Sequence, residues 1–279
     1  MSADGLAPAL HAFPIGIPRH AFSPREAARA ADVWRAFQEV AVEGSTRSGW
    51  PPARYREAGA GFIVRRMSVA HDREAVFGEP MEARTWVRPF RREMFSTREV
   101  RLLGAGGSIA RGTQQWVHVD ASLRPVRAGA ALLASFPPHE GGASVALPSF
   151  GPLSSEASTH RFEFDVWHAW MDPLDHVNHP AYLEFADEAT SRVMHAAGLS
   201  PSCLRPLFES VTFRAGVRAG DRVLVQTRPV GYLEGGPLVL SHHVSVAQTL
   251  CAELLTIRCL EGGENQRLWR AFGLSERSP

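Results

Sequence analysis

The sequence predicts an α+β protein of two similar halves, each with one long helix and about five strands in an antiparallel sheet. Two observations support this fold class. A helical pattern followed by a series of strand patterns occurs twice along the 279 residues. Segment lengths also match, since residues 78–85 and 220–227 are each a turn entering a strand that ends in threonine. One half alone would leave a sheet face and a helix poorly covered, whereas two packed halves bury both.

In the first half, residues 23–48 are predicted to form the helix, with Ser23 as N-cap and Pro24 in the first turn. Gly49 and Pro51 are expected to end it. Five residues at helical spacing should share its buried face: Val33, Trp34, Phe37, Val40 and Ala41. Strands are expected near 62–71, 80–90, 94–103 and 109–119.

In the second half, the alternation of apolar and polar residues over 160–167 predicts a strand. A helix should follow from about Pro180 to Ala197, stopped by Gly198 and Pro201. Further strands are expected near 207–217, 222–232, 237–247 and 250–260.

The predicted domain organisation therefore has four parts. A first repeat covers 1–127, and a second repeat covers 158–262. The segment 128–157 is rich in Pro, Gly, Ala and Ser, which is typical of a linker. Residues 263–279 are expected to form a C-terminal tail.

Composition narrows the class of function. A net charge of about +1 favours neither nucleic-acid nor membrane partners. All basic residues are arginine, so catalysis through a lysine Schiff base is excluded. The three scattered cysteines fit reduced thiols, and no signal peptide or membrane span is expected. We expect a cytoplasmic enzyme without a cofactor.

The segment 172–188 carries the chemistry. Asp172 and His176 lie on either side of a turn, Asn178 is the expected N-cap, and Pro180 suits the first helical turn. Asp172 could activate water or attack a carbonyl, and N–H groups at the helix start could hold an oxyanion. Simpler roles stay open, namely an Asx turn at Asp172, a packed or surface His176 and a plain cap at Asn178.

This loop, Asp172-Pro-Leu-Asp-His176-Val-Asn178, resembles that of the hotdog-fold thioesterases. The first half resembles the acyl-acyl carrier protein thioesterases, whose N-terminal repeat is similar at Thr85-Trp86, Arg91-Arg92, 95–98 and 116–120. The resemblance implies a tandem (double) hotdog, in which two central helices are each wrapped by an antiparallel sheet. It also implies hydrolysis of an acyl-ACP or acyl-CoA thioester to free acid and thiol.

Two features depart from the plant-type members of that family. Leu174 stands where they have asparagine, and Gly216 and Val217 stand where they have a Glu-Cys pair. The loop is therefore closer to the general bacterial hotdog version, in which the aspartate is the main catalytic carboxylate.

By resemblance, Asp172, His176 and Asn178 would be the catalytic residues, and no metal is expected. The first loop, around 22–26, lacks counterparts of Asp172 and His176, so the first half should supply the pocket wall. Candidate substrate contacts are Gln38, Glu39, His179, Tyr182 and Glu188, although Glu188 would more simply pair with Arg192. Candidate contacts to the carrier protein or coenzyme A are Arg88, Arg91 and Arg92, within a dense run of arginines.

Two other functions stay open, as does a homodimer. One is a hotdog dehydratase or hydratase acting on 3-hydroxyacyl thioesters, whose aspartate and histidine are usually five apart, whereas here they are four apart. The other is a non-catalytic acyl-carrier-binding protein, which Leu174, Gly216 and Val217 would allow.

Overall fold

The computed structural model describes residues 9–153 and 157–274 and divides the chain into two compact units. The first unit comprises Met1–Arg19 and Val33–Val145, and the second comprises His20–Asp32 and Ala146–Pro279. Parts of the expected first repeat, linker and tail (residues 1–8, 154–156 and 275–279) lie outside the described residues.

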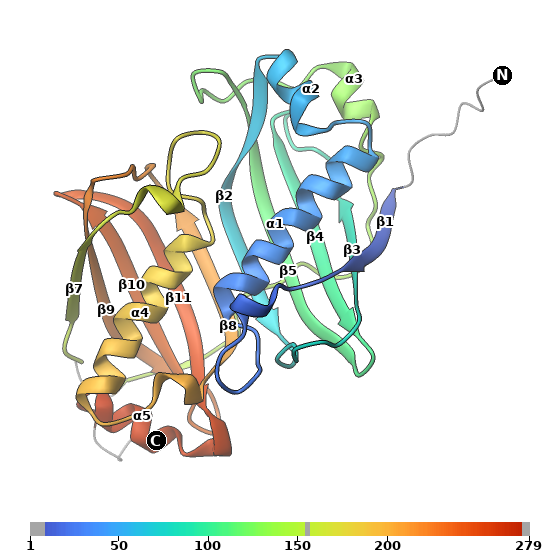
Figure 1. The fold of residues 1–279 in the computed structure, drawn as a ribbon. Helices are drawn as coiled ribbons and strands as arrows, with labels where there is room; N and C mark the ends of the chain where they lie inside the picture. The colour runs from blue at the N-terminus through green and yellow to red at the C-terminus, as the bar shows by residue number, and fades with distance from the viewer. Residues whose placement is uncertain (1–8, 154–156, 275–279) are drawn as a thin grey trace. The chain divides into compact units, whose positions relative to one another are not determined.

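In the first unit, five strands form an antiparallel sheet in the order β1-β3-β4-β5-β2. They are β1 (Leu10–Ile15), β2 (Ala60–His71), β3 (Met81–Val87), β4 (Phe95–Gly104) and β5 (Gly107–Asp120). The helices are α1 (Ala30–Arg47), α2 (Pro52–Glu57) and α3 (Ala130–Ala134). Figure 1 shows α1 lying across one face of the sheet. The strand β1 was not among the expected strands. It contains Pro14, which is tolerated because β1 lies at the edge of the sheet.

The packing of α1 confirms its predicted buried face. Trp34, Phe37 and Val40 are all completely buried. Gly112 of β5 lets the helix approach closely, since a Cβ atom there would lie 2.3 Å from the Phe37 ring. A side chain at Gly112 would push α1 away from the sheet.

The predicted start of this helix is wrong. The chain enters a tight turn at Ser23 instead, in which Glu26 has a φ of 57° and its N–H donates to the Ser23 carbonyl. The helix begins only at Ala30. Ser-Pro-Arg-Glu satisfies the rules for a tight turn as well as those for a helix start.

In the second unit, the sheet order is β8-β11-β10-β9, and both β6 and β7 pair with β9. The strands are β6 (Gly151–Pro152), β7 (His160–Asp165), β8 (Leu204–Phe213), β9 (Arg222–Tyr232), β10 (Leu238–Val246) and β11 (Thr249–Leu260). The helices are α4 (Ala181–Ala196) and α5 (Asn265–Ala271). The helix α4 lies across its sheet as α1 does in the first unit (Figure 1).

The order of elements repeats along the chain. The series β1, the 3-10 turn Arg19–Ala21, α1 and β2 to β5 corresponds to β7, the 3-10 turn His168–Trp170, α4 and β8 to β11. The expected tail contains α5, which the sequence pattern did not indicate. Its Leu268 and Trp269 pack with Val193 and Met194 of α4 in a buried cluster. Residues 265–271 therefore contribute to the core of the second unit.

Polar groups are buried between α4 and its sheet. Arg258 of β11 is 2% exposed and forms ion pairs with Glu209 of β8 and Asp187 of α4. His242 bonds through its two ring nitrogens to the hydroxyls of Thr227 and Thr256. Burial lowers the pKa of His242 to about 3, with the positive charge of Arg258 acting in the same direction. The His242 imidazole is therefore neutral and hydrogen-bonded, and the charge of the Arg258 guanidinium is balanced by carboxylates, so both buried groups have partners.

We expect Arg258→Met to destabilise the protein by about 3–5 kcal/mol, because Glu209 would be left buried without a counter-charge. Urea unfolding at neutral pH measures the effect. Glu188→Gln breaks a half-exposed pair with Arg192 and is the matched control, with an expected cost of about 0.5 kcal/mol. Equal costs in the two variants would contradict this account of Arg258.

Candidate active site

The loop from Trp167 to Pro180 is held by backbone hydrogen bonds at both of its ends. The Asp172 N–H donates to the His176 carbonyl at 2.9 Å, which closes the turn. Asn178 N–H donates to the Trp170 carbonyl, and Val177 N–H donates to the Val217 carbonyl. Asp175, at the tip, has a φ of 58°, which non-glycine residues seldom adopt outside such turns. The loop therefore has one defined shape.

This shape brings Asp172 and His176 together. The Asp172 Oδ1 lies 3.3 Å from His176 Nδ1, and the side chains are 15% and 23% exposed. The same oxygen accepts the Leu174 N–H at 2.8 Å, so the simpler interpretation of Asp172 as an Asx turn is also correct. The structural role therefore fixes the carboxylate beside the imidazole.

The two groups shift each other's pKa. Burial acts to raise the pKa of Asp172, but the hydrogen bond and charge of His176 and backbone N–H groups hold it below its usual value. The hydrogen bond to Asp172 raises the pKa of His176, against a smaller opposing effect of burial. Near neutral pH the carboxylate is ionised and the charged imidazole is favoured. Their contribution to stability is lost as pH falls through the Asp172 pKa or rises through the His176 pKa.

Asn178 does not cap the helix, contrary to expectation. Pro180 is the N-cap residue, and no side chain caps the first turn of α4. The helix starts too late for the Asn178 side chain, and its carbonyl instead accepts the Ala181 N–H. Its side-chain Oδ1 is buried and has no hydrogen-bond partner among the described residues. A buried amide oxygen in this state has capacity for a water molecule or a ligand.

Two further predicted residues lie next to the pair. Burial lowers the pKa of His179 to about 3, although the charge of Asp172 opposes this, so the imidazole is neutral. Tyr182 is 2% exposed, contacts the Phe213 ring and accepts a hydrogen bond from the Val217 N–H. Burial raises the pKa of Tyr182, which keeps the phenol protonated. Both side chains extend the loop site into the core below it.

The loop before α1 has the same backbone geometry without the same chemistry. The Ser23 N–H donates to the Ala27 carbonyl, as Asp172 does to His176, and the Arg29 N–H donates to the Ala21 carbonyl. Ser23 and Ala27 therefore occupy the positions of Asp172 and His176. The first loop thus carries neither a carboxylate nor an imidazole at these two positions.

Several solved structures share this architecture. A protein described as an oleoyl thioesterase from Lactobacillus plantarum is 18% identical, with a TM-score of 0.75 over 90% of this chain and 96% of that one. The 12:0-ACP thioesterase from Umbellularia californica is 14% identical, with a TM-score of 0.75 over 92% and 96%. An acyl-ACP thioesterase from Bacteroides thetaiotaomicron is 12% identical, with a TM-score of 0.68 over 90% and 98%. At these identities the likeness establishes the fold.

Family models decide the class. No curated protein matches the chain at the sequence level. Residues 18–128 match the acyl-ACP thioesterase N-terminal domain, and residues 174–232 match the thioesterase superfamily. The chain is therefore a thioesterase. The expected resemblance is confirmed, and the second match begins inside the Asp172 loop.

The positions at which this thioesterase departs from plant-type members lie at the site itself. A Cβ atom on Gly216 would be 3.6 Å from the His176 Cβ, so the glycine backbone lies against the imidazole. Val217 holds the loop through its carbonyl. Leu174, at the loop tip, is 47% exposed. The Asp172–His176 pair thus stands here without a neighbouring side chain from position 216.

Sequence analysis missed the aromatic support of the loop. Trp170 donates from Nε1 to Glu184 of α4 at 3.0 Å and stacks on Trp167. Trp167 is the last residue of the predicted strand, and Trp170 ends the short 3-10 segment that follows it. Their proximity to the motif was the only available signal.

The remaining predicted contacts of the thioesterase lie on the two long helices. Glu188 pairs with Arg192 at 2.9 Å on the exposed side of α4, as its simpler interpretation predicted. Gln38 and Glu39 lie on α1 of the first unit, half-buried and exposed respectively. Asp187, the residue before Glu188, is the ion-pair partner of Arg258.

The arginine run of the first unit does not form one face. Arg88 Nε donates to the buried Glu99 at 2.9 Å. Arg98 is buried, and burial lowers its pKa to about 10. Arg91 and Arg92 are exposed at the turn before β4, so they stay candidates for docking.

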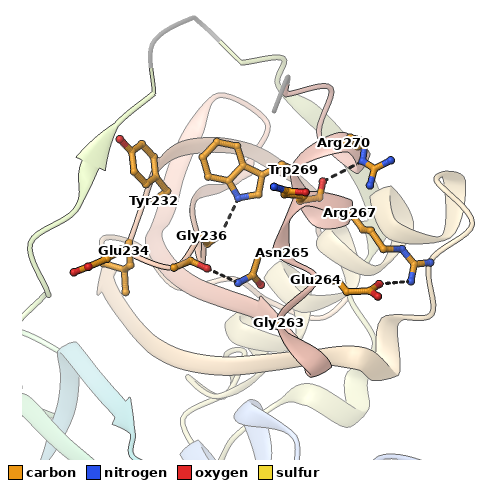
Figure 2. A pocket seen from close by; sticks show the side chains of 12 residues that line it. Tyr232, Glu234, Gly236, Gly263, Glu264, Asn265, Arg267, Trp269 and Arg270 are labelled. Atoms are coloured by element: carbon orange, nitrogen blue, oxygen red, sulfur yellow. Dashed lines mark hydrogen bonds and ion pairs between the residues drawn. The ribbon is translucent and has the colours of Figure 1, made fainter. Parts of the chain in front are cut away.

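A hollow of about 730 Å³ lies between α5 and the turn joining β9 and β10, and Figure 2 shows the side chains that line it. Asn265 and Trp269 donate to the carbonyls of Gly235 and Gly236 across it. No predicted site residue lines this hollow. It adjoins α5, which packs near the end of α4, whereas the Asp172 loop precedes the start of that helix. It is therefore separate from the candidate site.

The described residues contain neither a candidate metal-binding cluster nor a candidate membrane-spanning helix. No cluster of three or more His, Cys, Asp or Glu side chains there is arranged to hold a metal ion. Across residues 9–153 and 157–274, no helix combines the length and apolarity that crossing a membrane requires.

We expect Asp172→Asn to lower the pKa of His176, because the stabilising carboxylate is removed while the burial of the imidazole persists. NMR titration of histidine-labelled protein measures this pKa. The matched control is Asp175→Asn, which removes the exposed carboxylate at the loop tip and should leave the His176 titration unchanged. An unchanged His176 titration in Asp172→Asn would show that the pair is not formed in solution.

Proposed function

We propose that this thioesterase hydrolyses acyl thioesters carried by acyl carrier protein or coenzyme A, with Asp172 and His176 as its catalytic pair. The observation that carries the proposal is the contact between an ionised carboxylate and an imidazole in a rigid loop before a helix. The N-terminal end of α4 adds a positive potential beside them. This arrangement suits a reaction in which negative charge develops on a carbonyl oxygen.

In the proposed reaction, Asp172 accepts a proton from a water molecule as the water oxygen adds to the thioester carbonyl carbon. The negative charge that forms on the carbonyl oxygen is stabilised by N–H groups at the start of α4 and by the Asn178 amide. The tetrahedral intermediate then collapses, the carbon–sulfur bond breaks, and the proton passes to the departing thiolate. Free acid and thiol are the products.

Two properties of the site support these roles. The depressed pKa of Asp172 keeps it ionised over the neutral range. His176 lies against Oδ1 and so fixes the direction of the carboxylate, and its raised pKa makes a proton available for the sulfur. The unsatisfied Oδ1 of Asn178 supports a role for this amide in binding water or substrate.

The repeated order of elements supports a tandem hotdog as the architecture of this enzyme. In this proposal the repeats are 1–127 and 158–262, joined by the linker 128–157. Only the second repeat would catalyse the reaction, because Ser23 and Ala27 replace the catalytic pair in the first loop. A role in fatty acid biosynthesis would follow from this substrate class.

We expect Asp172→Asn to reduce kcat for thiol release by about 10²–10⁴-fold, since the proton acceptor is lost. A thiol-reactive dye, applied to a panel of acyl-CoA and acyl-ACP substrates, measures the rate. His243→Gln changes a half-buried histidine on β10 and is the control. Full activity of a folded Asp172→Asn protein would refute the assignment. Addition of water to an enoyl thioester without thiol release would instead identify a hydratase.

A further inference from the structure

The turn from Val217 to Asp221 lies against both ends of the Asp172 loop. On one side, the Val177 N–H donates to the Val217 carbonyl at 2.7 Å. On the other, the Val166 N–H donates to the Asp221 carbonyl, and the Gly220 N–H donates to the Val166 carbonyl, each at 3.0 Å. Residues at the tip of this turn therefore stand between the entrance of the loop and His176.

Arg218 occupies that tip. Its backbone N–H donates to the Asp221 carboxylate at 2.8 Å, which fixes the turn, and its side chain is exposed. Within residues 9–153 and 157–274, the guanidinium of Arg218 makes no hydrogen bond and no ion pair. Nearby arginines differ, since Arg214 pairs with Glu253 and Arg222 with Asp165. Arg218 is close enough to lower the pKa of His176 slightly through its charge.

An exposed aromatic surface adjoins this cation. Trp167 is 68% exposed and follows Val166, which is bonded to the turn. One face of its indole stacks on Trp170, with centroids 5.3 Å apart and planes inclined by 13°. Trp170 is itself held by Glu184, so the stack is rigid. The two stacked indoles offer a flat apolar surface beside the loop, and the solvent-exposed face of Trp167 leaves room for part of a ligand.

We propose that Arg218 binds the phosphate of the phosphopantetheine arm that carries the acyl thioester, with the arm lying along the Trp167 indole. This inference rests on the proposed function and adds the part of the substrate that the enzyme holds. A guanidinium forms paired hydrogen bonds with phosphate oxygens, and that chemistry is common to acyl carrier protein and coenzyme A. The apolar part of the arm would cover the open face of Trp167.

Kinetics of Arg218→Gln test the phosphate contact. The substrates are one acyl group carried by acyl carrier protein, by coenzyme A and by N-acetylcysteamine, which has no phosphate. We expect the ratio of KM for the phosphate-bearing thioesters to KM for the N-acetylcysteamine thioester to rise about tenfold, the change for roughly 1.4 kcal/mol of binding. In Arg218→Lys this KM ratio should rise less than in Arg218→Gln, because the positive charge is retained.

Arg228→Gln is the matched control. Arg228 is an exposed arginine of β9 in the same unit and makes no side-chain contact among the described residues, so the ratio should stay at its wild-type value. A rise restricted to one carrier identifies which phosphate Arg218 binds. An unchanged ratio in Arg218→Gln, or an equal change of KM on all three substrates, overturns the proposal.

A binding measurement separates this proposal from the proposed function. Coenzyme A is titrated into the Asp172→Asn protein, with and without Arg218→Gln, and quenching of tryptophan fluorescence is followed. The expected result is about tenfold weaker binding without Arg218, and a signal that is lost in Trp167→Phe. Equal affinities of coenzyme A for the two proteins would refute the contact between Arg218 and the phosphate, even if hydrolysis were demonstrated. Failure of wild-type protein to release thiol would refute the proposed function, and the titration would still decide the role of Arg218.

Discussion

The tight loop that leads into each long helix is the constraint on which the candidate site depends. The segments that lead from β1 into α1 and from β7 into α4, residues 16–29 and 166–180, each reverse the chain in a turn closed by backbone hydrogen bonds. In the second unit this reversal is closed by bonds between Asp172 and His176, Asn178 and Trp170, and Val177 and Val217. The backbone thereby holds the proposed catalytic side chains, Asp172 and His176, side by side before a substrate binds, which is the form of preorganisation that catalysis needs.

Much of this frame could be predicted from local patterns. Alternation located the long strands, and helical spacing identified the buried face of α1, because both depend on residues close together in sequence. The start of α1 was misplaced, since Ser23-Pro24 suits a turn and a helix equally. The cap role of Asn178 was misassigned for a related reason, as the helix begins two residues later than its side chain can serve.

The contacts that could not be predicted join residues far apart in sequence. Arg258 meets Glu209 and Asp187 only once three elements have packed. Arg218 came to notice because hydrogen bonds place its turn beside Val166 and Val177, a relation that no spacing rule contains. The motif identified Asp172 and His176. The pKa shift that each causes in the other depends on the distance between their side chains, which the motif does not contain.

The two entry loops share one backbone path and differ in the groups they carry. Asp172 supplies a carboxylate that can accept a proton, and His176 supplies an imidazole that can donate one to sulfur. Ser23 and Ala27 have neither group. The stoichiometry of the enzyme follows from this asymmetry. Each polypeptide would have one active site although it contains two repeats. Titration with a tight-binding thioester analogue would then give one binding site per chain.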